Sequence, residues 1–345
     1  MCLKSSTITR QSHISTRKGS YEPRRTPESN SPVDENVLQQ PMFFEKIAKE
    51  RLARVQSRVN RFEKSPGIYK VVIPAAGIGT RLLPVTKEMP KEMLPVFSAS
   101  HGALCLKPVL HVIFETLVES GLRDFCIIVG RAKRAVEDYF TVDDSFLRWL
   151  VRNGKLEAAS ELSNFYGGIR RSSIAFVNQH ESKGFGHAVL CAKSFVGRDS
   201  FLLHAGDDLI VSRRDHISRL KNAYRKTNAD AAFFVERTAH PERYGVIRAK
   251  RLKDGIYKVT GLVEKPKRPP SKLGVIAIYA LSPIVFDYLE AVKPDKAGEM
   301  QLADAIGAMI RDRLNVIAIG LQQGERRVDI GSPETYRMAL TSVFR

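Results

Sequence analysis

The chain has 345 residues, 43% of them hydrophobic, which is enough to bury a sizeable core in one large domain or two. No stretch approaches the roughly 18 consecutive apolar residues of a membrane-spanning helix, which excludes an integral membrane protein. The formal net charge of +18 favours anionic ligands, but no nucleic-acid-binding motif accompanies it and aromatic residues are sparse in the basic stretches, so no specific nucleic-acid partner is expected.

The first 41 residues are rich in Ser, Thr, Arg, Pro and Gln and have almost no apolar periodicity, which predicts a disordered basic extension over residues 1–41. Residues 1–21 contain no acidic residue and resemble a transit peptide, yet they lack an apolar face. A solvated tail, or a start codon placed too early with Met42 as the later start, fits this composition better. No catalytic residue is expected in the extension.

An amphipathic helix is predicted over residues 42–65. Its apolar residues are spaced 4, 3, 4 and 3 positions apart and form one stripe: Ala48, Leu52, Val55, Val59 and Phe62. Such a stripe can pair two subunits or pack on the chain's own catalytic domain, and we favour the second. The tripeptide at 65–67, Ser-Pro-Gly, is expected to end the helix before the first strand.

The stretch from Lys70 to Pro95, KVVIPAAGIGTRLLPVTKEMPKEMLP, carries the clearest chemistry. Its first residues predict a short buried strand that is closed by Pro74. The glycine-containing loop that follows lets backbone N–H groups approach phosphate oxygens. Three cationic side chains come next at short spacing: Arg81, Lys87 and Lys91. The predicted ligand is therefore a polyphosphate.

Two common phosphate-binding loops do not fit this stretch. The dinucleotide fingerprint needs a small residue where Leu82 stands, and the P-loop needs a Gly-Lys-Ser/Thr tripeptide that does not follow. The whole stretch instead resembles the signature of sugar-1-phosphate nucleotidyltransferases, and its ending, PKEMLP, is most similar to the bacterial and archaeal UTP:glucose-1-phosphate uridylyltransferases. The resemblance extends from about Lys70 to the C-terminus. It implies catalytic roles for Arg81 and Lys91 and nucleotide contacts at Ala76, Gly77, Gly79 and Thr80.

The segment after a strand predicted at 173–177 resembles the part of this family that holds the nucleobase. The resemblance implies that Gln179 hydrogen-bonds uracil through its amide and that Gly184 lets the ring lie against backbone. An amide suits this task because it offers a donor and an acceptor in one plane. His187 suggests a general base, but none is expected, because a phosphomonoester oxygen (second pKa about 6) is already ionised near neutral pH.

A strand predicted at 201–206 delivers Asp207 and Asp208 at its carboxyl end, where open α/β sheets bind ligands. Adjacent carboxylates repel each other unless a cation or hydrogen-bond donors meet them, which predicts a metal ion. Mg²⁺ takes hard oxygen ligands and commonly one or two protein carboxylates beside substrate phosphates. The resemblance assigns the metal to Asp207 and Asp329. Asp329 is expected on a loop leading into the last helix, with Ser332 as the N-cap.

Two motifs, YGVI at 244–247 and GLVEKP at 261–266, resemble the sugar side of the family. The resemblance implies that Glu264 accepts hydrogen bonds from glucose hydroxyls, that Gly245 lets the sugar approach backbone and that Lys265 reaches the sugar phosphate. Asp208 is also assigned to the sugar. Four residues depart from the bacterial pattern, which has Asn, Arg, Thr and Gln at these places: Lys272, Ile278, Ala303 and His111. The first two are expected to flank the sugar pocket.

Together these features predict an α/β protein with a Rossmann-like nucleotidyltransferase fold, in which residues 66–345 form the catalytic domain around a mixed, mostly parallel sheet with flanking helices. Further strands are predicted at 125–129, 230–235, 273–281 and 315–321. The resemblance implies transfer of the uridylyl group of UTP to glucose 1-phosphate by in-line attack with Mg²⁺, giving UDP-glucose and pyrophosphate.

Alternatives stay open: a relative that uses dTTP or another sugar 1-phosphate, or a non-catalytic regulatory relative. The presence of all five charged residues argues against the last: Arg81, Lys91, Asp207, Lys265 and Asp329. The cysteines at 2, 105, 126 and 191 show neither a CxxC nor a metal spacing, so reduced thiols in a cytoplasm are expected. We expect a homo-oligomer, a dimer or a tetramer, with no membrane partner.

Overall fold

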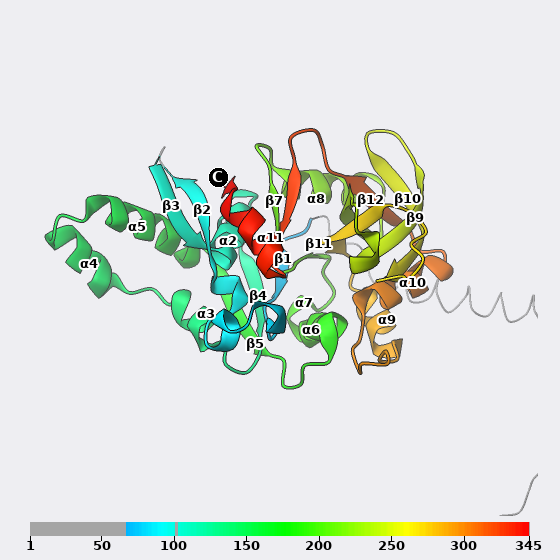
Figure 1. Cartoon of the computed structure of the whole chain (residues 1–345), viewed down its shortest axis with the longest axis horizontal. Helices are drawn as coiled ribbons and strands as arrows, with labels where there is room; N and C mark the ends of the chain where they lie inside the picture. The colour runs from blue at the N-terminus through cyan, green and yellow to red at the C-terminus, as the bar shows by residue number, and fades with distance from the viewer. Residues whose placement is uncertain (1–66, 101–102, 345) are drawn as a thin grey trace, which may run out of the picture. The chain divides into compact units, whose positions relative to one another are not determined.

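The computed structural model describes residues 67–100 and 103–344 (Figure 1). The predicted extension at 1–41 and the predicted helix at 42–65 lie outside these residues and stay predictions. Among the described residues, none of the helices is long and apolar enough to cross a membrane. The three cysteines of this part, Cys105, Cys126 and Cys191, are free thiols.

The main sheet has nine strands in the order β5-β4-β1-β6-β11-β8-β12-β10-β9. Their bounds are β1 (Lys70–Pro74), β4 (Asp124–Val129), β5 (Ser173–Asn178), β6 (Phe201–His204), β8 (Ala231–Arg237), β9 (Gly245–Arg251), β10 (Ile256–Glu264), β11 (Leu273–Leu281) and β12 (Val316–Gly320). The pairings give all of these strands one direction except β10 and β11. The prediction of a mixed, mostly parallel sheet is confirmed.

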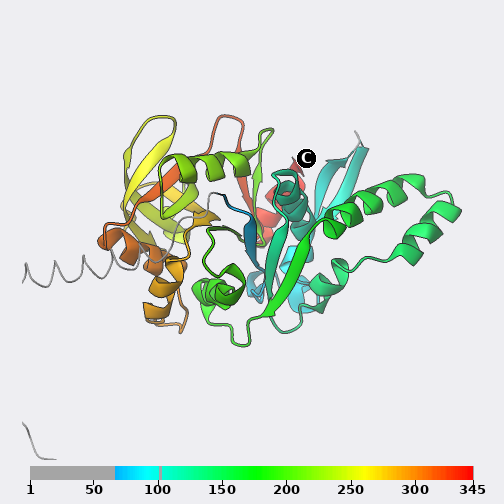
Figure 2. The ribbon, with the colours of Figure 1, turned by 180° about the vertical axis from the view of Figure 1, so that it is seen from behind.

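Alternate residues of the parallel strands enter two separate cores, as the period of a strand requires. In β4, Phe125 and Ile127 join one core while Cys126 and Ile128 join the other. The first core is covered by α2 (Val109–Glu119) and α8 (His216–Lys226), seen in front in Figure 2. The second is covered by α6 (Gly184–Cys191), α7 (Lys193–Val196), α9 (Val285–Ala291) and α10 (Leu302–Arg311). Burial on both faces explains the unbroken apolar runs of these strands.

Two smaller sheets complete the described part. β7 (Asp208–Val211) pairs antiparallel with β13 (Arg326–Asp329). β2 (Pro95–Ser100) and β3 (Ala103–Pro108) form a hairpin, to which β14 (Val343–Phe344) adds beside β2. Three helices, α3 (Arg134–Tyr139), α4 (Asp144–Arg152) and α5 (Leu156–Arg170), form the excursion between β4 and β5 in Figure 1. The last helix is α11 (Pro333–Leu340), and Ser332 caps it as predicted.

Candidate active site

The loop after β1 is shaped by one left-handed glycine. Gly79 has φ 74°, which favours glycine, and precedes a short 3-10 turn, η2 (Thr80–Leu82). The Thr86 hydroxyl donates a hydrogen bond of 2.8 Å to the Gly79 carbonyl and so ties the loop to the next turn, η3 (Val85–Lys87). The predicted nucleotide contacts of this loop are exposed or half-buried: Ala76, Gly77, Gly79 and Thr80. The loop is therefore accessible to a ligand.

Lys91 is a largely buried positive charge beside this loop. It begins the turn η4 (Lys91–Met93), and its ammonium forms an ion pair with the carboxylate of Asp207. Burial alone would lower the pKa of Lys91, but the negative charges of Asp207 and Glu92 outweigh burial and raise the pKa above its usual value. Lys91 is therefore protonated at neutral pH and aligned with the end of β6.

Asp207 and Asp329 come together from distant parts of the chain. Asp207 lies in the turn between β6 and β7, and its carbonyl accepts a 2.9 Å hydrogen bond from the Ile330 amide. Asp329 is the last residue of β13 and pairs with Asp208 of β7. The expectation that Asp329 lies on a loop is wrong, because the antiparallel pairing extends the strand up to it. A Cβ at Gly331 would lie 2.9 Å from the Asp329 carboxylate and 3.0 Å from the Arg81 guanidinium, so these two charges adjoin.

The two carboxylates fit a hard divalent cation. Burial, and then the negative charges of Asp208 and Asp207, raise the pKa of Asp329 to about 6. A divalent cation would relieve this repulsion. No cluster of three or more His, Cys, Asp or Glu side chains suited to a metal occurs within the described ranges. Two carboxylates together with oxygens from a substrate or from water are a ligand set that suits Mg²⁺.

Asp208 is bound tightly by an arginine for which the sequence predicts no role. Arg327 donates from Nε and Nη2 to the two carboxylate oxygens at 2.7 and 2.8 Å, and the Ala277 amide donates to Oδ2 at 3.0 Å. Asp208 is 2% exposed. Both oxygens thus have protein partners, so a sugar hydroxyl would have to share one of them. The predicted contact of Asp208 with the sugar stays a prediction.

The predicted sugar residues lie on neighbouring strands. Gly245 begins β9 and is paired with Glu264 at the end of β10. A Cβ at Gly245 would lie 3.1 Å from Oε2 of Glu264, so the absence of a side chain makes room for this carboxylate. Burial raises the pKa of Glu264, and the ammonium of Lys265, 3.4 Å away, opposes the shift. Lys265 has φ 39°, an uncommon value for a residue with a side chain, and its amide donates to the Tyr244 carbonyl at 3.1 Å.

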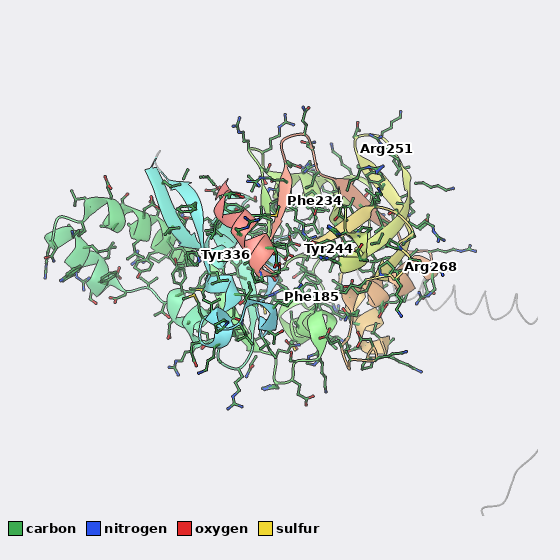
Figure 3. The ribbon with its side chains drawn as sticks, viewed as in Figure 1. Phe185, Phe234, Tyr244, Arg251, Arg268 and Tyr336 are labelled. Atoms are coloured by element: carbon green, nitrogen blue, oxygen red, sulfur yellow. The ribbon has the colours of Figure 1, made fainter. Side chains whose placement is uncertain are left out.

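A cleft of about 860 Å³ connects the predicted phosphate and metal residues with the predicted sugar residues. Phe185 at the start of α6 and Tyr244 just before β9 both line it (Figure 3). All of the predicted catalytic, metal and sugar residues also line it: Arg81, Lys91, Asp207, Asp208, Gly245, Glu264, Lys265 and Asp329. The volume lies within the range of small-molecule sites, which is roughly 300–1,000 Å³. The chain therefore brings a cationic loop, two carboxylates and a predicted sugar pocket into one cavity.

The residues predicted to hold the base do not line this cleft. Gln179 is 7% exposed, and its Nε2 lies 3.2 Å from the Gly184 carbonyl and 3.0 Å from Nδ1 of His187. A Cβ at Gly184 would lie 2.8 Å from Cβ of Glu299. Glycine at 184 is therefore required by packing against the segment before α10, and its predicted contact with the base stays a prediction.

Several residues near the site are not predicted from the sequence. Arg327 is the clearest case: it stands two positions before Asp329, so strand alternation places both side chains on one face. That spacing is the signal that could have identified it. Lys133 is a second case, since its ammonium donates at 2.7 Å to Glu92, which is buried next to Lys91. No local pattern identifies that contact.

The four departures from the bacterial pattern fall in different places. Ala303 lines the cleft. Ile278 is fully buried in the core and Lys272 is exposed, and neither lines the cleft, so their expected place beside the sugar pocket stays a prediction. His111 is buried, with Nδ1 2.7 Å from the Tyr139 hydroxyl. Of the four, Ala303 is therefore the one placed to influence a ligand.

Known proteins share this sequence and fold. The profile of the family described as Nucleotidyl transferase matches residues 70–343. The UTP–glucose-1-phosphate uridylyltransferase of Bacillus subtilis is 38% identical over 246 residues, which cover 69% of this chain and 79% of that protein. A protein of Methanocaldococcus jannaschii named as a putative enzyme of the same kind is 35% identical over 268 residues, covering 76% and 89%.

Solved structures agree with the sequence relatives. A UDP-glucose pyrophosphorylase complexed with UDP-glucose superposes with a TM-score of 0.69 at 34% identity, over 79% of this chain and 97% of that one. The UTP-bound enzyme from Acinetobacter baumannii superposes with a TM-score of 0.68 at 31% identity, over 79% and 92%. Sequence profile, relatives and fold converge on one assignment. This chain belongs to the nucleotidyl transferase family, among the UTP–glucose-1-phosphate uridylyltransferases.

Proposed function

We propose that this protein transfers the uridylyl group of UTP to glucose 1-phosphate and releases pyrophosphate and UDP-glucose. The observation that carries the proposal is the single cleft that joins the cations and carboxylates after β1, β6 and β13 to the sugar motif of β9 and β10. The relatives named for this activity support it. So do the solved relatives, one complexed with UDP-glucose and another bound to UTP.

The chemistry needs positioning and charge neutralisation more than bond-making groups from the protein. A phosphate oxygen of glucose 1-phosphate attacks the α-phosphorus of UTP in line, and the bond from that phosphorus to the β-phosphate oxygen breaks. Arg81 and Lys91 bind the triphosphate and stabilise the negative charge on the departing pyrophosphate. Lys265 orients the sugar phosphate. No covalent intermediate on the enzyme is required.

The two carboxylates after β6 and at the end of β13 would hold the metal ion. Asp207 and Asp329 are the proposed ligands of Mg²⁺, which when bound neutralises charge on the triphosphate. Lys91 forms its ion pair with Asp207, so it can pass from that carboxylate to a phosphate oxygen as the ligand enters. The two carboxylates would then face Mg²⁺, and the Lys91 ammonium would face a phosphate oxygen.

We propose separate contacts for the base and for the sugar. Gln179 and Gly184 hold uracil, with the backbone of the loop at 76–80 beneath the phosphates. Gly245 and Glu264 hold the glucose ring, with Asp208 behind them. We also propose that the enzyme is cytoplasmic and acts as a homo-oligomer, a dimer or a tetramer, whose mass sedimentation would measure.

The test is pyrophosphate release from a panel of nucleotides and sugar phosphates. Purified full-length protein is assayed with UTP, dTTP, CTP, ATP or GTP against glucose, galactose, mannose and N-acetylglucosamine 1-phosphates. The highest kcat/KM is expected for UTP with glucose 1-phosphate, and Asp207→Asn should reduce it by at least about 100-fold. A higher kcat/KM with another pair of substrates would replace UTP and glucose 1-phosphate as the assigned substrates. Absence of turnover with every pair in a folded, Mg²⁺-loaded protein would favour the regulatory relative.

A further inference from the structure

Arg327 is a buried cation between the two halves of the cleft. Its guanidinium donates two hydrogen bonds to Asp208, at 2.7 and 2.8 Å. The same group stacks on the ring of Tyr244, with 4.4 Å from the guanidinium carbon to the ring centre. Nη1 lies 3.7 Å from the Glu236 carboxylate, too far for a hydrogen bond. One side chain thus touches the strand that carries the carboxylates and the segment that carries the sugar motif.

The contacts of Asp208 separate it from its neighbour Asp207. Both oxygens of the Asp208 carboxylate have partners, Arg327 on each and the Ala277 amide on Oδ2, and Asp208 is buried. The Asp207 carboxylate is half-buried and is paired with Lys91 beside the phosphate loop. The adjacent carboxylates of Asp207 and Asp208 are therefore paired with different cationic side chains, Lys91 and Arg327. Of the two, Asp207 is the one that faces the loop.

Tyr244 extends the influence of Arg327 to the sugar side. The Tyr244 carbonyl accepts the hydrogen bond from the Lys265 amide at 3.1 Å. The next residue is Gly245, against which the Glu264 carboxylate lies. The Arg327 guanidinium lies on the face of the Tyr244 ring and therefore supports Tyr244. Tyr244 in turn is hydrogen-bonded to Lys265 through its carbonyl and precedes Gly245, so it adjoins both predicted sugar motifs.

We propose that Arg327 is a positioning residue that withholds Asp208 from the metal ion, so that Asp207 and not Asp208 joins Asp329 as a ligand, and that anchors Tyr244 and with it the sugar motif. The inference rests on the function proposed above. Arg327 acts through Asp208 and Tyr244 and makes no proposed contact with the reacting atoms. It therefore links metal placement and sugar placement through one guanidinium.

A merely structural ion pair would have a different signature. Loss of such a pair would lower thermal stability, and metal binding and turnover would fall together as the fold weakens. Withholding of Asp208 predicts opposite movements. Without Arg327, Asp208 becomes an additional negative charge near Asp207, so a divalent cation binds at least as tightly but in an unproductive position.

The experiment compares Arg327→Met and Arg327→Lys with a matched control, Arg326→Met. Arg326 precedes Arg327 in β13 and donates at 2.6 Å to the Ser342 hydroxyl, which does not line the cleft. The control therefore removes the same charge from the same strand. The double variant Asp208→Asn/Arg327→Met removes both buried charges, so it keeps the test decisive if Arg327→Met alone does not fold.

Kinetics, binding and stability are measured on each full-length variant. The quantities are kcat and KM for both substrates, Mn²⁺ affinity without nucleotide by the electron paramagnetic resonance of free Mn²⁺, glucose 1-phosphate affinity by calorimetry, and Tm. For Arg327→Met we expect kcat to fall by about 100-fold or more, Mn²⁺ affinity to stay equal or rise, and glucose 1-phosphate affinity to fall several-fold. Arg327→Lys should be intermediate, because it keeps the charge but loses the bidentate contact.

The double variant should recover at least about tenfold in kcat over Arg327→Met, because the uncharged amide that replaces the Asp208 carboxylate no longer competes for the metal. The inference is overturned if folded Arg327→Met matches Arg326→Met in kcat and sugar affinity. It is also overturned if Mn²⁺ affinity falls in step with turnover, or if the double variant is no more active than the single one. An inactive wild-type protein would overturn the proposed function instead, and the Mn²⁺ and calorimetric measurements would still decide the role of Arg327.

Discussion

The Asp329 carboxylate is held where its charge is unfavourable in the ligand-free protein. Burial and the nearby Asp208 and Asp207 raise its pKa from 3.8 to about 6. The folded state therefore holds this proton more tightly than the unfolded state. The resulting stabilisation is complete below about pH 4 and is lost as the pH rises through about 6. At neutral pH the ionised Asp329 destabilises the ligand-free fold.

Asp329→Asn is therefore expected to stabilise the metal-free protein at pH 7 and to abolish turnover. A shift of this size corresponds to about 1 to 3 kcal/mol, which should raise Tm by a few degrees in a domain of this length. Turnover should fall by at least about 100-fold, because a charged ligand of Mg²⁺ is removed. Calorimetry without metal and the pyrophosphate assay measure the two effects.

The pH and the metal supply the controls for this variant. At pH 5 the wild-type carboxyl is protonated, so the gain in Tm should shrink. Added Mg²⁺ should raise the Tm of the wild type more than that of the variant, because only the wild type keeps both carboxylates. Equal Tm values at pH 7 together with near-normal turnover would remove Asp329 from the metal site.

Gln179 gives a second test at a single side chain. Gln179→Glu replaces the amide donor with an acceptor, so a carbonyl of the base, and the Gly184 carbonyl 3.2 Å from Nε2, would face an anion. The loss of one such contact is worth roughly 1 to 3 kcal/mol, or about 5 to 150-fold in kcat/KM for UTP. KM for glucose 1-phosphate should change much less, because that pocket is built from Gly245, Glu264 and Lys265. Initial rates with each substrate varied in turn measure both.

His187→Ala provides the comparison for Gln179→Glu. It removes the ring whose Nδ1 lies 3.0 Å from Nε2 of Gln179 but leaves the amide in place. Its effect on UTP should be smaller. A folded Gln179→Glu protein with an unchanged kcat/KM for UTP would mean that the base is read elsewhere.

Secondary-structure elements differ in how far their sequence predicts them. Strands such as β1 and β11 are predictable because burial on both faces leaves an apolar run with clear ends. The pairing of β7 with β13 is not, because four-residue strands more than a hundred positions apart carry no local signal. The position of Asp329 and the contact of Asp208 with Arg327 both depend on that pairing. The other site residues are predictable through motifs whose meaning comes from the family.

Close packing between α6 and the segment before α10 can be tested at Gly186, a glycine within α6. A Cβ at Gly186 would lie 2.8 Å from the Met300 carbonyl, which also accepts a hydrogen bond from the Gly186 amide. Gly186→Ala should therefore push the two segments apart and cost about 1 to 3 kcal/mol. KM for the substrates should rise as well, because Phe185 and Gln301 on either side line the cleft. Thermal unfolding and initial rates measure these effects.

Gly167→Ala is the matched control within α5. The new Cβ would lie 3.3 Å from the end of the flexible Arg171 side chain, which can move. Helix propensity then dominates and should stabilise the protein by about 0.5 to 1 kcal/mol. If the two alanine variants were equally stable, close backbone packing at Gly186 would not be the reason for glycine there.

For the chain as a whole, the predicted site is independent of the N-terminal region. The predicted site residues lie between Ala76 and Asp329, and the family profile begins at residue 70. Deletion of residues 1–41 should leave kcat and both KM values within about twofold of the full-length protein. Initial rates on the truncated chain measure this, with circular dichroism as the check of folding. A folded but inactive truncation would show that the extension reaches the site or holds an oligomer together, and sedimentation would separate these two outcomes.

The hairpin from β9 to β10 carries two of the predicted sugar contacts, Gly245 and Glu264, in one continuous piece of chain. Gly245 opens it and Glu264 closes it, paired with each other across the two strands. The proposed phosphate and metal groups, in contrast, come from residues scattered between Arg81 and Asp329. Substitutions within this one stretch of the gene can therefore alter the proposed sugar contacts of Gly245 and Glu264 while leaving Arg81, Lys91, Asp207 and Asp329 unchanged in sequence. The sugar contacts of this hairpin and the groups proposed for phosphoryl transfer are thus encoded in different parts of the gene.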